Sequence, residues 1–307
     1  MRITIPLRDV GTAHARVRDT CQSIILIGFQ DQANLGIGYV ASVLRSRGYT
    51  VRVYDFKLDR RQILEAALAQ PPLLIGFSLI FQFYVHRFHE LAAYLRDNGV
   101  TCHFTMGGHF PSLSYRAALD LVPEVDSIVR FEGELTALEL ADRLSTGRDW
   151  REVQGIAYRD GQAAVTTPLR ALLHDLDELP YPDRSAAPPT TMLGRVAVPI
   201  LASRGCVRTC SFCSIHTFYR TAPGKVVRTR RPAEVVKEMR ALYEEKGATI
   251  FLFQDDDFPL FGPVWQRWAR EFIAELHRND LPGRVIWKIN CRADVVEPGL
   301  FAAMRNA

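Results

Sequence analysis

Short apolar runs alternate with amphipathic stretches over the first half of the chain, and this alternation predicts its architecture. The run 23–29 is almost entirely apolar, as expected for a strand buried on both faces of a parallel sheet. Similar runs lie at 51–55, 73–78, 101–106 and 127–130, and stretches with helical spacing of apolar residues lie at 35–47, 61–69, 85–98, 114–121 and 135–144. Strict alternation of strands and helices predicts an α/β fold with a doubly wound sheet.

The pattern resumes in the second half after an interruption. The stretch 149–192 holds a hairpin, turned at Asp160-Gly161, and a proline-rich segment, which together are typical of a linker. Apolar runs then return at 196–201, 249–253 and 285–290, with helical stretches at 231–246, 264–278 and from 298 onward. We therefore predict a first domain at 1–148 and a second domain of β/α units at 193–307.

Composition is that of an ordinary soluble protein. The 307 residues are 48% hydrophobic and 23% charged, and they suffice for two separate cores. The net charge of +4 is spread along the chain, so no nucleic-acid footprint is expected. The longest apolar run, 71–81, is too short to span a bilayer, and the N-terminus lacks a signal pattern, which predicts a cytoplasmic protein.

Three closely spaced cysteines are the main candidates for a functional site in the sequence. Cys206, Cys210 and Cys213 follow the apolar run 196–201, so they lie after the first strand of the second domain, where α/β folds place their ligand sites. Three thiols at this spacing can hold three corners of one iron–sulfur cluster and leave the fourth corner open. Zinc, with His216 as fourth ligand, is the alternative, although structural zinc ligands usually come as two separated pairs.

This C-x3-C-x2-C triplet, with Phe212 before its last cysteine, resembles the signature of the radical SAM superfamily. The resemblance implies that Cys206, Cys210 and Cys213 hold a [4Fe–4S] cluster whose open iron chelates S-adenosylmethionine. It also implies reductive cleavage of that cofactor to a 5′-deoxyadenosyl radical. A small-molecule substrate and an electron donor of the flavodoxin or ferredoxin type are the partners that such chemistry implies.

Carboxylates follow the second strand of this domain. Asp255 and Asp256 are neighbours at the end of an apolar run, and adjacent carboxylates repel each other unless a partner is present. They are candidates to accept hydrogen bonds from the amino group or ribose of S-adenosylmethionine, and a D-D-x-F phrase here is usual in the resembling family. The alternative is a capping cluster for the helix that begins near Pro263. Arg292, after the third strand, is a candidate clamp for a carboxylate or a member of a surface ion pair.

Small residues in the first domain follow a spacing that resembles the cobalamin-binding motif. That motif reads D-x-H-x-x-G, then 41 residues, S-x-L, 26 to 28 residues, and G-G. Here Asp31 and Gly36 frame the first part, Ser78 begins the second, and Gly107 and Gly108 form the third. A dinucleotide fingerprint, G-x-G-x-x-G, is not found after the first strand.

Ala33 stands where this motif has the histidine that ligates cobalt. The resemblance therefore implies a corrin whose lower axial face is open, water-bound or covered by another side chain. The small residues would let the nucleotide tail of the cofactor approach the backbone. Glu132, Gly133 and Glu134 also resemble a glycine-glutamate phrase near the end of this domain type. A first domain without cofactor is the alternative.

Taken together, the motifs resemble the family of cobalamin-dependent radical SAM enzymes. The implied architecture is a Rossmann-like cobalamin-binding domain followed by a partial radical SAM (β/α) barrel. Only three β/α units fit after the linker, whereas such barrels usually have six, so we expect a chain that is incomplete at its C-terminus. The implied reaction is methylation of an unactivated carbon with cobalamin as methyl carrier, or another radical rearrangement or ring closure. The alternatives are a radical SAM enzyme with an empty first domain, or a non-catalytic cofactor-binding fragment.

Overall fold

The computed structural model describes residues 22–30, 34–187 and 190–307, which divide into two compact units. The first unit consists of residues up to Leu172 together with Leu179–Ala187 and Arg220–Pro223. The second unit consists of Leu173–Glu178, the residues from 190 to Tyr219, and Gly224–Ala307. Within the described ranges, no helix combines the length and the apolar character needed to cross a bilayer.

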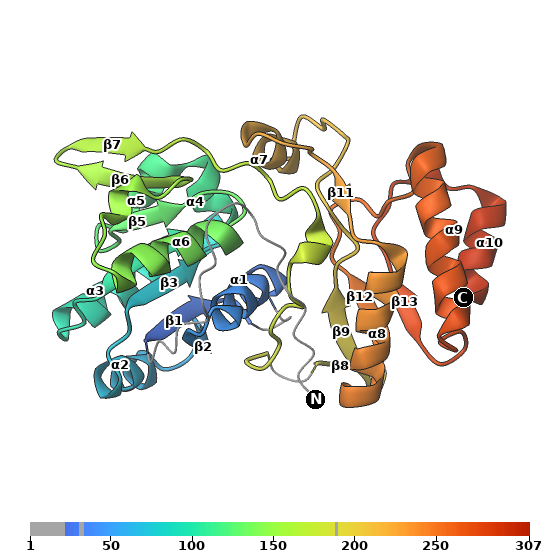
Figure 1. Cartoon of the computed structure of the whole chain (residues 1–307), viewed down its shortest axis with the longest axis horizontal. Coiled ribbons are helices and arrows are strands. Elements are labelled where there is room, and N and C mark those ends of the chain that lie inside the picture. Colours follow the sequence, from blue (N-terminus) through green and yellow to red (C-terminus); the bar gives the residue numbers. More distant parts are fainter. Residues whose placement is uncertain (1–21, 31–33, 188–189) are drawn as a thin grey trace. The chain divides into compact units, whose positions relative to one another are not determined.

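The first unit is built on a sheet that has seven strands in the described part of the chain (Figure 1). The strands are β1 (Ser23–Gly28), β2 (Thr50–Asp55), β3 (Leu74–Ser78), β4 (His103–Gly107), β5 (Ser127–Val129), β6 (Ile156–Asp160) and β7 (Ala163–Thr166). Their order is β2-β1-β3-β4-β5-β6-β7, in which β1 to β5 are parallel and β6 and β7 are antiparallel. The connecting helices are α1 (Leu35–Ser46), α2 (Arg60–Ala69), α3 (Val85–Asp97), α4 (His109–Leu113), α5 (Tyr115–Leu121) and α6 (Glu134–Ser145).

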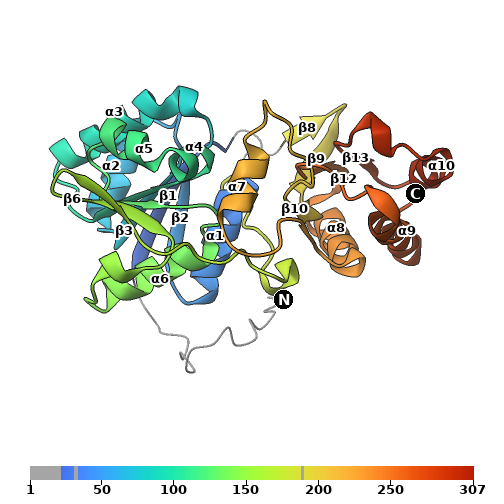
Figure 2. The same cartoon turned by 90° about the horizontal axis from the view of Figure 1, so that it is seen from above.

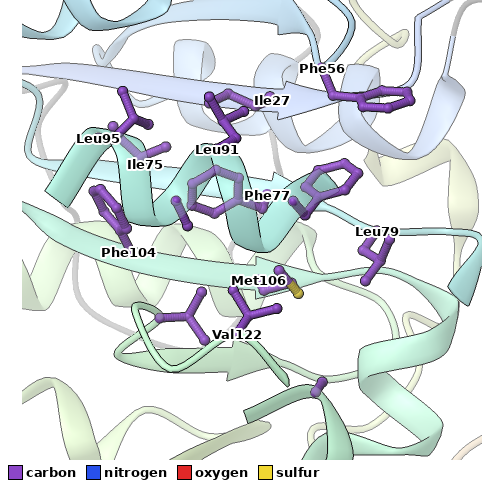
Figure 3. Close-up of a cluster of buried hydrophobic side chains, with 14 of the residues drawn as sticks. Ile27, Phe56, Ile75, Phe77, Leu79, Leu91, Leu95, Phe104, Met106 and Val122 are labelled. Atoms are coloured by element: carbon purple, nitrogen blue, oxygen red, sulfur yellow. The ribbon is translucent and has the colours of Figure 1, made fainter. Parts of the chain in front are cut away.

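Helices cover both faces of this sheet, as the alternation of strands and helices predicts. Figure 2 shows α2, α3 and α5 on one side of the strands and α1 and α6 on the other. The face under α3 carries large side chains, among them Phe77, Phe104 and Met106, which pack with Leu91 and Leu95 of that helix (Figure 3). Because successive strand residues point to opposite faces, the residues between these positions face α1 and α6. The predicted doubly wound α/β fold is confirmed.

The hairpin that the sequence places in the linker instead extends the first sheet. Strand β6 pairs with β5, and Asp160 of β6 faces Ala163 of β7 across a two-residue turn at Gly161-Gln162. The turn therefore lies one residue later than predicted. Gly161 has a φ of 59°, a conformation that glycine adopts without steric cost.

The second unit is built on a smaller sheet, which has four strands among the described residues. The strand order is β13-β12-β9-β8; β9, β12 and β13 are parallel and β8 is antiparallel. The elements are β8 (Thr190–Met192), β9 (Arg195–Ile200), β10 (Ser203–Arg204), α7 (Ile215–Thr221), β11 (Arg228–Thr229), α8 (Pro232–Lys246), β12 (Ala248–Phe253), α9 (Gly262–Arg278), β13 (Ile286–Lys288) and α10 (Pro298–Asn306). Helices α8, α9 and α10 share one apolar core with β9 and β12.

Local sequence explains where the long helices of this unit begin and end. Pro232 occupies the first turn of α8, where its missing N–H is not needed. Gly247 ends the helix in the left-handed conformation, with φ 64° and ψ 26°. The result is three β/α units in succession, which place the loops after β9, β12 and β13 at one edge of the sheet, because the three strands are parallel.

Candidate functional site

Small residues line the carboxyl edge of the first sheet. Gly28, Ser78 and Gly107 end the neighbouring strands β1, β3 and β4, and they pair in register with one another. We call these three residues the edge row. A Cβ on Gly28 would lie 3.0 Å from the Ser78 Cβ and 3.1 Å from Cδ1 of Ile37 on α1. Larger side chains would therefore not fit here without displacing α1.

Gly108, directly after the edge row, has a conformation that only glycine adopts readily. Its φ is 111°, and an added Cβ would lie 2.4 Å from the carbonyl oxygen of Leu79. The Leu79 amide donates a hydrogen bond to the Gly107 carbonyl at 2.8 Å. The turn after β4 therefore packs directly on the backbone that follows β3, which gives the glycine pair of the sequence motif a physical reason.

The sheet face behind the edge row is lined with small or short polar residues. Gly76 and Thr105 pair in register on β3 and β4, and Thr105 pairs with Ser127 on β5. The Ser127 hydroxyl donates to the Thr105 hydroxyl at 2.9 Å, and both side chains are buried. On the opposite face, the same strands carry phenylalanine and methionine. The two faces of β3 and β4 therefore differ in the size of their side chains.

The remaining candidates of the first domain are dispersed. Asp31 lies outside the described residues, and Gly36 is exposed in the first turn of α1. Glu132 and Gly133 precede α6, and Glu134 is buried in its first turn. The structure thus brings Ser78, Gly107 and Gly108 together, with Gly28 as an additional member that the motif did not indicate. The role of each in binding a cofactor stays a prediction.

The three cysteines lie on one loop of the second unit, between β10 and α7. We call residues 205–214 the cysteine loop. Cys206, Cys210 and Cys213 are all half-buried. The Cys213 amide donates to the Cys210 carbonyl at 3.0 Å, and the Arg208 amide donates to the Cys206 sulfur at 3.4 Å. The loop is therefore tightly turned, and its three cysteines are partly exposed.

Carboxylates from the end of β12 hold the start of this loop. Both oxygens of Asp255 accept hydrogen bonds, one from the Ala202 amide at 3.2 Å and one from the Ser203 hydroxyl at 2.5 Å. Asp256 accepts from the Gly205 amide at 3.1 Å. Neither carboxylate caps the following helix, because the N-cap of α9 is Phe261 and no side chain bonds there. The capping alternative is therefore wrong, and contact of these residues with S-adenosylmethionine stays a prediction.

Gly205 fixes the path of the chain into the cysteine loop. Its φ is 89°, and an added Cβ would lie 2.0 Å from the Val226 carbonyl oxygen. Strand β10 also pairs with β11, which sets Arg204 opposite Arg228. The loop is thus tied to two other segments of the second unit, and its first cysteine has little freedom to move.

Electrostatics around the loop favour a bound cation. Burial raises the pKa of Asp255 to about 7, although its hydrogen bonds act in the opposite direction. Burial raises the pKa of the Cys206 thiol, and the Asp257 and Asp256 carboxylates add to this shift. A thiolate beside carboxylates is unfavourable unless metal charge compensates it, and metal coordination deprotonates a thiol. Metal coordination at Cys206 would relieve this unfavourable arrangement.

The zinc alternative finds no preformed site. Within residues 22–30, 34–187 and 190–307, no three side chains of the histidine, cysteine, aspartate or glutamate type converge to hold one metal ion. A zinc ion requires that convergence, because its thiolate ligands lie about 2.3 Å from one atom. A [4Fe–4S] cluster instead offers a separate iron to each cysteine. The choice between a cluster and zinc therefore stays a prediction.

The other candidates near the loop are at the surface. The Phe212 side chain is 91% exposed. Arg292 is exposed and donates to Asp294 at 3.1 Å, and its Nη1 lies 3.9 Å from the Cys210 sulfur. Arg208 also pairs with Asp294, at 3.2 Å. Arg292 is thus placed at the edge of the loop within an ion pair, and a role as carboxylate clamp stays a prediction.

A buried charge network below the cysteine loop was not predicted. Arg230 forms an ion pair with Glu238 at 2.5 Å and lies 3.5 Å from Asp177. The Nη1 of Arg230 donates to the Leu201 carbonyl at 2.9 Å, and the Trp268 indole Nε1 donates to the Arg230 carbonyl at 2.7 Å. This network holds the strand end that leads into the loop. No sequence pattern singles out Arg230 from the adjacent arginines.

Comparisons with known proteins agree with these observations. A family model described as "B12 binding domain" matches residues 28–141. The chain is 32% identical over 272 residues to the anaerobic magnesium-protoporphyrin IX monomethyl ester cyclase of Rubrivivax gelatinosus, covering 83% of this chain and 46% of that protein. The chain thus spans about half the length of this relative.

Two solved structures share the fold over nearly the whole chain. The radical S-adenosylmethionine methyltransferase TsrM from Kitasatospora setae, with cobalamin and a [4Fe–4S] cluster bound, matches with a TM-score of 0.74 and 21% identity, covering 92% of this chain and 57% of that chain. The cobalamin-dependent S-adenosylmethionine radical enzyme OxsB, with aqua-cobalamin and S-adenosylmethionine bound, matches with a TM-score of 0.72 and 20% identity, covering 91% of this chain and 40% of that chain. At this identity the likeness establishes the fold.

Proposed function

We propose that this chain, which belongs to the family of radical SAM enzymes with a B12-binding domain, binds cobalamin in its first unit and a [4Fe–4S] cluster with S-adenosylmethionine in its second. The observation that carries the proposal is the anchored cysteine loop, combined in one chain with the edge row of the first sheet. Each feature alone occurs in many α/β proteins. Their combination in one chain distinguishes this family.

The side chains have distinct tasks in this proposal. Cys206, Cys210 and Cys213 would each ligate one iron. Asp255 and Asp256 hold the start of the loop through its backbone and Ser203, so that the first thiol stays in place. Because both Asp255 oxygens are already hydrogen-bonded, positioning of the loop is the task that its contacts support best.

In the first unit, the edge row and Gly108 allow the strand ends and the turn after β4 to pack closely, and the cofactor would bind beside this edge of the sheet. When bound, the cluster and S-adenosylmethionine would supply radical chemistry and cobalamin would carry a methyl group, while the protein orients them and excludes water. We propose methylation of an unactivated carbon in a small molecule as the reaction of the longer protein. A cytoplasmic location and a flavodoxin-like or ferredoxin-like electron donor belong to the same proposal.

Anaerobic reconstitution tests the second unit. Protein treated with iron and sulfide should bind about four iron atoms and four sulfides, and should form 5′-deoxyadenosine with S-adenosylmethionine and a reductant. Cys210→Ala should lose most of the iron. Cys102→Ala, a half-buried cysteine of the first unit, is the matched control and should keep it. Stoichiometric zinc without sulfide, or full iron content in Cys210→Ala, would overturn the assignment.

Cobalamin binding is measured separately. Added hydroxocobalamin should co-elute with the protein in gel filtration at a ratio close to one, and its visible spectrum should change on binding. Failure to bind would leave the cluster chemistry in place and would favour the enzyme with an empty first domain. Binding of both cofactors without formation of 5′-deoxyadenosine would indicate a cofactor-binding fragment.

A further inference from the structure

Aromatic side chains gather where β1 and β3 end in the first unit. Phe29 directly follows the edge-row residue Gly28, and Phe81 and Phe83 lie in the segment after β3, next to Tyr84. We call these four aromatic residues the edge aromatics. The Phe29 ring lies 6.2 Å from Phe81 in an edge-on arrangement and 6.3 Å from Tyr84 in a stacked one, measured between centroids. The cluster therefore adjoins the edge row.

Two of the edge aromatics pack on the apolar core, and the other two are exposed. Phe29 and Tyr84 pack on the core, and Phe56 lies 5.9 Å from the first and 5.0 Å from the second. By contrast, Phe81 is 53% exposed and Phe83 is 86% exposed. Scattered exposed apolar residues are normal, whereas an exposed pair next to a candidate ligand site indicates a surface that a ligand covers.

The position of the pair identifies the ligand surface. In the cobalamin motif, the cobalt-ligating histidine lies in the segment after the first strand, so the lower side of a bound corrin would lie over this edge of the sheet. Ala33 occupies that position here and cannot ligate cobalt. The neighbouring segment after β3 instead offers two phenylalanine rings. Aromatic rings offer a large apolar surface that can pack against a flat macrocycle and exclude water from it.

We propose that Phe81 and Phe83 pack against the lower face of the corrin and keep water away from the cobalt. The inference rests on the proposed binding of cobalamin and adds a residue pair to it. The cofactor would bind beside the edge row, and the two rings would take the surface that a ligating histidine would otherwise occupy. A corrin bound here would then meet these two rings in place of a ligating side chain.

Electron paramagnetic resonance of bound cob(II)alamin tests this inference directly. The unaltered protein should give the spectrum of four-coordinate cob(II)alamin. The double variant Phe81→Ala/Phe83→Ala should give the five-coordinate, water-bound spectrum. Its Kd for cobalamin should rise at least tenfold, which corresponds to about 1.4 kcal/mol. Leu68→Ala and Leu121→Ala, which remove exposed leucines from α2 and α5, should change neither quantity.

Each outcome separates this inference from the proposed function. If the unaltered protein binds no cobalamin, cobalamin binding itself is refuted, and this inference falls with it. If the unaltered protein binds cobalamin but gives the water-bound spectrum, only the role of the two rings is refuted. The same holds if the double variant and the unaltered protein have the same spectrum and the same Kd. A double variant that changes the oligomeric state alone indicates a protein partner for this surface and also refutes it. Phe83→Ala, at the more exposed position, repeats the test if the double variant fails to fold.

Discussion

Replacing Asp255 by asparagine should change how the stability of the second unit depends on pH. The carboxylate is 3% exposed, and burial raises its pKa from 3.8 to about 7. The folded chain therefore keeps a proton on Asp255 between pH 4 and pH 7, whereas the unfolded chain has lost it. By linkage, this contribution to stability is full below pH 4 and is lost as the pH rises through 7.

The size of the Asp255 pKa shift sets the expected change in stability. From 3.8 to about 7 is roughly three pH units, or about 4 kcal/mol in total. Most of it falls above pH 5, so between pH 5 and pH 8 the contribution of Asp255 should drop by about 3 kcal/mol. The asparagine side chain does not titrate and is nearly isosteric. The stability advantage of the unaltered protein over Asp255→Asn should therefore shrink by this amount over the same interval.

Urea unfolding before iron is added measures this difference at pH 5 and at pH 8. Fluorescence suits the assay, because Trp265, Trp268 and Trp287 lie in the second unit and report its unfolding. Glu245→Gln, on the exposed side of α8, is the control for a carboxylate without buried contacts. If the advantage of the unaltered protein over Asp255→Asn changes by less than about 0.5 kcal/mol between the two pH values, the buried carboxylate does not titrate as argued.

Two further predictions concern backbone and charge. Gly108→Ala should destabilise the first unit by more than 2 kcal/mol, because the new Cβ would meet the Leu79 carbonyl at 2.4 Å. The control Gly99→Ala, at a glycine with φ 89° and no neighbouring atom within 4 Å of the new Cβ, should cost only about 1 kcal/mol. Equal losses of stability in urea unfolding would contradict the steric argument. Glu238→Gln should lower the unfolding free energy of the second unit by about 3 kcal/mol, because it breaks the buried ion pair with Arg230. An unchanged urea midpoint would show that Asp177 alone compensates the charge of the Arg230 guanidinium.

The first sheet could be predicted from sequence because its signals are local. Continuous apolar runs such as Ser23–Gly28 indicate buried parallel strands, and the amphipathic stretches between them indicate helices. Short elements without such a pattern were missed, among them α4, the edge strand β8 and the two-residue pair β10 and β11. The hairpin was recognised, but its membership of the first sheet was not, because pairing between β5 and β6 depends on partners distant in sequence.

The candidate site, too, could be predicted only where its signals are local in sequence. Cys206, Cys210 and Cys213 are recognisable because a loop places ligands that are close in sequence close in space. The hydrogen bonds that hold the loop are not recognisable, because Asp255 lies 52 residues beyond Ser203. The adjacent carboxylates indicated a functional position without indicating which groups they contact. Gly28 likewise became part of the edge row only through strand register.

Two buried anchors fix the chain where it enters the cysteine loop. Arg230 holds the Leu201 carbonyl before the loop, and Asp255 holds Ser203 two residues later. One anchor is a buried cation paired with Glu238, and the other is a buried acid that hydrogen-bonds the backbone. Both contacts lie outside the loop itself, so they fix its entry without using the thiols. The three thiols would therefore remain available as the proposed cluster ligands.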